Sequence, residues 1–80
     1  MTINLICNKY WYGLLKDNKI DFDYRPITEH YTRMLVGKKI DKIVFRLGYT
    51  KTVLEREVED IFVGGIKGYE GRYYIIKLKK

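Results

Sequence analysis

The first part of the chain changes from an alternating pattern to a helical one. Ile3, Leu5 and Cys7 alternate with polar or less buried positions, as in a half-buried β-strand. Asn8 is a good N-cap, so a helix is predicted over residues 9–17. The side chains that share one face at helical spacing are Tyr10, Trp11, Leu14 and Leu15. We expect this face to belong to the core rather than to a stacking surface.

A second strand is predicted over residues 19–25. It follows Asn18, a residue that accepts the left-handed conformation in which helices often end. The apolar side of this strand would carry Ile20, Phe22 and Tyr24, and the charged side Asp21, Asp23 and Arg25.

Helical spacing returns in the next segment. Pro26 fits a helix start, and Thr28 offers a second choice of cap. The apolar positions that recur before Gly37 are Ile27, Tyr31, Met34 and Leu35. Residues 40–47 then predict a strand, with one face formed by Ile43, Phe45 and Leu47.

The last third of the chain predicts two strands separated by a glycine-rich loop. Residues 52–63 place Glu55, Glu57 and Glu59 on one face, and Leu54, Val58 and Phe62 on the other. Arg56 and Asp60 interrupt the apolar face, which indicates a bulge, a partly wet wall or a frayed end. Residues 72–78 form the final strand, whose inward side chains would be Tyr74, Ile76 and Leu78.

The expected fold is α+β, in the order β-α-β-α-β-β-β, as a single domain over residues 1–80. The first half is too short for two full crossover units, so a doubly wound sheet is not expected. We predict a small barrel of about five strands that closes or nearly closes, with two helices packed on it, because closure removes unpaired sheet edges. The expected core includes Trp11, Leu14, Phe22, Tyr31, Phe45, Val58 and Ile76.

Composition and charge narrow the possible functions. The 80 residues are 46% hydrophobic, enough for one core and too few for two. One cysteine and one histidine exclude an intramolecular disulfide and a structural zinc site. Sixteen Lys and Arg residues against ten Asp and Glu give a net charge of +6, which favours a polyanion such as RNA, with solubility as the alternative role. The opening residues lack the features of a signal peptide or a membrane span, so a cytoplasmic protein is expected.

Three segments together resemble the ASCH family, whose members have the PUA-like fold. They are Asp23-Tyr24-Arg25, the helix from Tyr31 to Leu35, and the run from Ile40 to Tyr49 that ends Phe-Arg-Leu-Gly-Tyr. Family members carry Gly-x-Lys-x-x-Glu-x-Arg after the first helix and a strand ending Phe-Arg-x-Gly-Tyr. The resemblance implies a cleft between helices and barrel that binds RNA or a modified nucleoside. Some members are reported as amidohydrolases acting on acylated cytidine, and others as ribonucleases.

The match at the first motif is partial. With Arg25 on the motif arginine, Asp23 stands at its glutamate, Ile20 at its lysine and Asn18 at its glycine. Lys19 lies one residue early and therefore on the opposite face of a strand, unless a bulge or the helix end re-aims it. Because Ile20 replaces the lysine, amidohydrolase activity is not expected. The sequence does not require catalysis.

The candidate nucleic-acid site combines charged and aromatic side chains. Asp23 could orient the planar guanidinium of Arg25 toward a phosphate or base edge, although the two could equally form a structural ion pair. Arg46, Tyr49 and Lys51 follow one another around a turn and suit one base and its phosphate, unless Tyr49 only packs on the rim and Lys51 is only solvated. The predicted contact residues are Lys19, Asp23, Arg25, Arg46, Tyr49 and Lys51.

Two other functions remain open. A ribonuclease would need Lys19, Asp23, Arg25 and His30 to converge, with His30 as an acid or base, although a lone histidine in a first helical turn is usually a surface residue. A protein-binding module, for instance a phage or mobile-element protein acting on host machinery, would show an exposed apolar patch such as Tyr69, Tyr73 and Ile75. No metal or cofactor is expected, because glutamates on alternate positions of one strand diverge.

Overall fold

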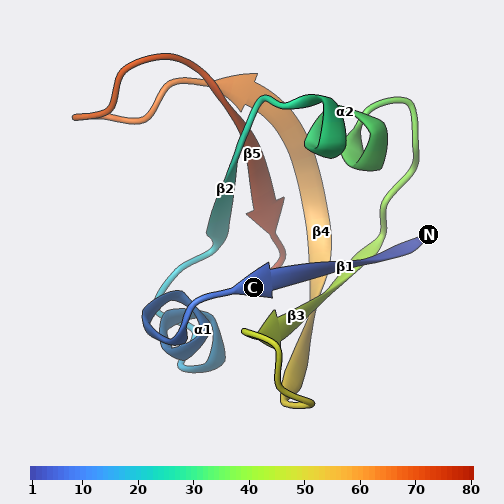
Figure 1. The fold of residues 1–80 in the computed structure, drawn as a ribbon, viewed down its shortest axis with the longest axis vertical. Coiled ribbons are helices and arrows are strands. Elements are labelled where there is room, and N and C mark those ends of the chain that lie inside the picture. The colour runs from blue at the N-terminus through green and yellow to red at the C-terminus, as the bar shows by residue number, and fades with distance from the viewer.

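The computed structural model describes residues 1–80 and contains two helices and a five-stranded mixed sheet (Figure 1). The elements are β1 (Thr2–Cys7), α1 (Lys9–Lys16), β2 (Phe22–Pro26), α2 (Glu29–Leu35), β3 (Lys42–Leu47), β4 (Val53–Gly64) and β5 (Tyr73–Leu78). The predicted α+β class and the order β-α-β-α-β-β-β are therefore confirmed.

The sheet has the strand order β1-β3-β4-β5-β2. β1 and β3 are parallel, and the other neighbours are antiparallel. β4, with 12 residues, pairs with β3 through its first half and with β5 through its second. Figure 1 shows this strand curving through the height of the molecule. β4 thus joins two smaller sheets into one.

The sheet does not close into a barrel. β1 and β2 are its two end strands, and no backbone ladder joins them. Side chains occupy the seam between these edges instead. Arg25 of β2 donates to the backbone carbonyl of Ile6 in β1, and Trp11 of α1 packs edge-on against Tyr24 at 6.1 Å. The predicted barrel remains open because these side chains stand where ladder hydrogen bonds would form.

Both helices begin at the residues whose side chains can cap them. Asn8 accepts a hydrogen bond from the backbone N–H of Trp11, and Thr28 accepts one from that of Tyr31. Asn18 follows α1 with φ at +55°, the left-handed conformation predicted for it. Pro26 ends β2 and does not start α2. Thr28, the second of the two predicted starts, is therefore the residue that caps α2.

The core lies between the helices and the inner face of the sheet. Of the seven predicted core residues, Phe45, Val58 and Ile76 are buried, whereas Trp11, Leu14, Phe22 and Tyr31 are only half-buried. The inward faces predicted for β1, β3 and β5 are confirmed, with Leu47 half-buried at the end of β3. On α1, Tyr10 is 74% exposed and Tyr12 is buried in its place.

The faces of β2 are the reverse of those predicted. Asp23 is 2% exposed and points inward, while Phe22 and Tyr24 are half-buried on the outer face. A charged side chain can face the interior when a partner compensates its charge, and Arg25 supplies that partner two residues away. The strand is also shorter than predicted, because the turn after α1 extends beyond Lys19.

A bulge in β4 explains its irregular pattern. The register with β5 shifts between Val58 and Asp60, so one extra residue enters the strand. As a result Ile61 packs against the core, and Phe62 lies on the outer face with 41% exposure. Of the three alternatives that the sequence left open here, the structure shows the bulge, and the predicted inward position of Phe62 is wrong.

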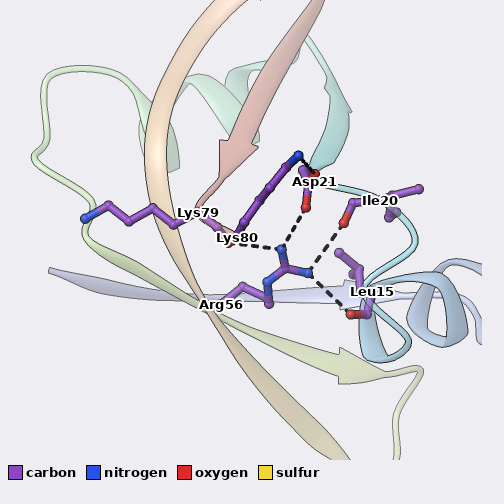
Figure 2. Close-up of polar contacts among 6 residues, drawn as sticks. All are labelled: Leu15, Ile20, Asp21, Arg56, Lys79 and Lys80. Atoms are coloured by element: carbon purple, nitrogen blue, oxygen red, sulfur yellow. Dashed lines mark hydrogen bonds and ion pairs between the residues drawn. The ribbon is translucent and has the colours of Figure 1, made fainter.

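Arg56 ties together three parts of the chain at one end of the fold (Figure 2). Its guanidinium donates to the backbone carbonyls of Leu15 at 3.3 Å, Ile20 at 3.5 Å and Lys79 at 3.1 Å, and to the Asp21 carboxylate at 3.3 Å. The side chain is 10% exposed. An arginine that seemed to interrupt the apolar face of β4 thus anchors the exit of α1 and the end of β5.

Neither helix is long and apolar enough to cross a membrane.

Candidate nucleic-acid interface

A pocket of about 300 Å³ opens at the seam between β1 and β2. It is lined by Ile6, Cys7, Asn8, Trp11, Asp23, Tyr24 and Arg25. Because side chains alternate along a strand, Cys7, Asp23 and Arg25 come from the inner faces of their strands, and Ile6 and Tyr24 from the outer faces. We call this hollow the seam pocket. It exists because the barrel is not closed.

Arg25 is held firmly within the seam pocket. Its Nε donates to Asp23 Oδ2 at 2.7 Å, and its Nη1 donates to the Ile6 carbonyl at 2.9 Å and to Tyr31 Oη at 3.2 Å. The Tyr31 ring also lies under the guanidinium, 5.7 Å from its carbon. Nη2 makes no hydrogen bond and is reached by solvent. The guanidinium is therefore oriented by the protein, and one of its nitrogens is left for a ligand.

Burial and pairing act in opposite directions on this ion pair. Burial disfavours the Asp23 carboxylate and raises its pKa, even though Arg25 offsets part of the effect. Burial alone would lower the pKa of Arg25. The attraction of the Asp23 carboxylate for the guanidinium is stronger than this effect, so the Arg25 pKa is raised. The guanidinium consequently stays protonated, and the cation in the pocket is permanent.

Trp11 supplies an unsatisfied donor beside Asp23. Its indole Nε1 is buried and has no hydrogen-bond partner of regular geometry. The indole N–H is nevertheless near enough to Asp23 to favour its charged form slightly. Buried donors without partners are uncommon in folded proteins. Trp11 therefore adds an aromatic surface to the seam pocket, while its buried N–H acts on Asp23.

Cys7 forms part of the inner wall of the pocket. Its thiol is buried and lies 3.6 Å from the carbonyl oxygen of Arg46. Burial raises the pKa of this thiol. Because the thiolate is the reactive form, this shift disfavours reaction at Cys7, which contributes a small apolar side chain to the wall.

The second group of predicted contact residues lies on the turn beside the seam pocket. Arg46 pairs with Ile6 across β1 and β3, so it is one strand away from the rim of the pocket. Its Nη1 donates to the Thr50 carbonyl at 2.8 Å. Tyr49 is 95% exposed, and Lys51 is also exposed. Tyr49 therefore does not pack on the rim, and none of the three residues lines the pocket itself.

Lys19 and His30 are not brought into the pocket. Lys19 is exposed in the turn after α1 and is absent from the pocket lining. His30 is exposed on α2, with its ring edge-on to Tyr31 at 5.0 Å. Only Asp23 and Arg25 of the four proposed ribonuclease groups come together. The convergence that such an enzyme needs is not present in this structure.

Outside the seam pocket, the structure has a second hollow but no metal-binding cluster. No group of three or more His, Cys, Asp and Glu side chains is arranged to hold a metal ion. A second hollow of about 680 Å³ lies between the α2–β3 connection and β4, and its charged lining residues are Lys38, Lys39, Lys79, Asp41, Glu59 and Asp60. The exposed apolar patch predicted for a protein partner, Tyr69, Tyr73 and Ile75, does not form as predicted, because Ile75 is only 6% exposed.

Sequence reasoning identified Asp23 and Arg25 but missed their surroundings. Ile6, Asn8 and Trp11 line the seam pocket although they were assigned to a strand, a cap and a core face. The available signal was the short distance in sequence between the end of β1 and the start of α1, which places these residues at one sheet edge. No family model, curated protein or solved structure matches the chain.

Proposed function

We propose that this protein is a PUA-like domain that binds RNA or a nucleotide in the seam pocket. The observation that carries the proposal is the Arg25 guanidinium, fixed through Nε and Nη1 and free at Nη2. An oriented, permanently charged fork suits a phosphate or the acceptor edge of a base.

The size and lining of the seam pocket support a single nucleotide as its occupant. A volume of about 300 Å³ is at the small end of ligand sites. Trp11 and Tyr24 supply aromatic surface, and Nη2 of Arg25 supplies a donor that makes no hydrogen bond within the protein. Aromatic contacts combined with hydrogen bonds to base edges are the usual means by which proteins hold unpaired bases.

The turn after β3 extends this interface. Arg46 lies one strand from Ile6 at the pocket rim, and Tyr49 and Lys51 project from the turn that follows. These side chains would contact the phosphate and base next to the nucleotide in the pocket. The net charge of +6 favours the approach of such a polyanion.

A binding titration tests the proposal. The chain contains a single tryptophan, and this residue lines the seam pocket, so its fluorescence reports occupancy directly. Single-stranded RNA should quench or shift this signal, and affinity should fall steeply between about 50 mM and about 200 mM salt as phosphate contacts are screened. Duplex RNA and single-stranded DNA serve as comparisons. The absence of any Trp11 response to RNA or to nucleotides would exclude the proposal.

A further inference from the structure

The outer face of β2, β5 and β4 carries a cluster of aromatic side chains that no helix covers. The strand registers place nine residues on this face in three rows: Phe22, Lys77 and Asp60; Tyr24, Ile75 and Phe62; Pro26, Tyr73 and Gly64. Both helices pack on the opposite face, where Tyr12, Leu15 and Leu35 join the core. We call these three rows the outer face.

The outer face has a small apolar layer of its own. Ile75 is 6% exposed, yet it is not part of the 13-residue core cluster. Its Cδ1 would lie 3.0 Å from a Cβ placed on Gly64, so the missing side chain of Gly64 leaves the space that Ile75 fills. Phe62 and Tyr24 flank Ile75 directly across the strands. The apolar surface that remains accessible is therefore aromatic, and the buried Ile75 side chain packs between its rings.

Tyr24 connects the outer face with the seam pocket. It lines the pocket, its ring meets Trp11 edge-on, and it lies parallel to the Phe22 ring at 6.4 Å. A nucleotide held at Arg25 would thus have the outer face as its neighbour. At one end of the face Asp60 stands beside Lys77, and Arg72 precedes Tyr73 at the other.

We propose that the outer face stacks the bases next to the nucleotide in the seam pocket, so that the ligand is a single-stranded RNA oligomer. This inference rests on the proposed function. Aromatic side chains on an open sheet bind unpaired bases through their ring faces, with little dependence on sequence. The bound RNA would contact Tyr24, Phe62 and Tyr73, with Arg72 beside Tyr73 available to a phosphate.

The test compares a single nucleotide with longer ligands. Uridine monophosphate and uridine di-, tetra- and octanucleotides are titrated against the protein, with Trp11 fluorescence as the readout of the pocket. Affinity should rise by about tenfold for each base that stacks, until the outer face is filled. Phe62→Ala and Tyr73→Ala should remove most of this gain and leave monophosphate binding unchanged. Tyr10→Ala, at another exposed aromatic residue outside both surfaces, should change neither.

The outcomes separate the two proposals. If the monophosphate binds but longer ligands bind no more tightly, or if both face variants keep the full gain, the stacking face is overturned and the seam pocket stands. If no ligand changes Trp11 fluorescence, both proposals fail. NMR spectra of Phe62 and Tyr73 provide a second measurement. Their ring signals should shift with the tetranucleotide and not with the monophosphate, and the reverse result would count against the face.

Discussion

Arg25 donates a hydrogen bond to the backbone carbonyl of Ile6 across the one place where the sheet is not paired, at 2.9 Å. This side chain takes over the connection that a ladder between β1 and β2 would make. The same guanidinium binds Asp23 and Tyr31 and lines the seam pocket. Its structural and binding roles therefore rest on different nitrogens of one group, and both should respond to substitution.

Arg25→Lys should weaken RNA binding by about 1 to 3 kcal/mol and also lower the melting temperature. Lysine keeps the charge beside Asp23, but its single nitrogen cannot replace the fork. Affinity is measured at a temperature where both proteins are fully folded. Arg33→Lys, at a side chain 76% exposed, is the control and should change neither quantity. Unchanged affinity of the folded variant would remove Arg25 from the site.

Asp23→Asn should be close to the wild type in stability at neutral pH. Because burial raises the Asp23 pKa above its unfolded value, ionising this carboxyl costs more in the folded protein than in the unfolded one, and asparagine keeps an acceptor for Arg25. The stability that Asp23 contributes is fully present below its unfolded pKa, about 3.9, and is lost as pH rises through the folded pKa.

Chemical denaturation from about pH 3 to about pH 7 measures this difference. The free energy of unfolding of the wild type, minus that of Asp23→Asn, should decrease as pH rises. An increase with pH, or a loss of several kcal/mol in the variant at neutral pH, would show that the ion pair is stabilising instead.

Arg56→Met should lower the free energy of unfolding by about 2 to 4 kcal/mol. Methionine keeps much of the apolar volume but removes the guanidinium hydrogen bonds to three backbone carbonyls and the Asp21 carboxylate. Arg33→Met provides the matched control, because the exposed pair of Arg33 with Glu29 contributes little. Equal losses in the two variants, measured by urea denaturation, would contradict the anchoring role of Arg56.

Phe45→Ala should cost about 3 to 5 kcal/mol, because its side chain is fully buried at the centre of the core. A domain of this size has a total stability of about 4 to 12 kcal/mol, so the variant would be marginally folded. Circular dichroism during urea denaturation measures the loss. Val53→Ala, at a position 43% exposed, should stay within about 1 kcal/mol of the wild type.

Local patterns predicted the elements of this fold better than their closure. The alternation in β3 and β5 and the caps Asn8 and Thr28 were sufficient, because each depends on neighbouring residues. The prediction of which face of β2 points inward was wrong, because a pattern of charges does not reveal that Asp23 has Arg25 as a buried partner. The open seam depends on how side chains from three elements meet.

The candidate site was predicted in part for the same reason. Asp23 and Arg25 are close in sequence, so their pairing could be anticipated. Trp11 and Ile6 reach them only through the tertiary fold, and Lys19 is separated from them by the turn after α1. Arg46, Tyr49 and Lys51 stay predictions as ligand contacts.

The bulge in β4 gives the two halves of that strand opposite rules for tolerating substitution. Before it, the even-numbered positions Leu54 and Val58 face inward, whereas after it the inward position is the odd-numbered Ile61. Loss of the single residue Glu59 would restore a regular ladder. Because Asp60 would then follow Val58 directly, Ile61 would stay inward opposite Ile76 and Phe62 outward opposite Ile75, so that one alternation would govern the whole strand without altering any other side chain.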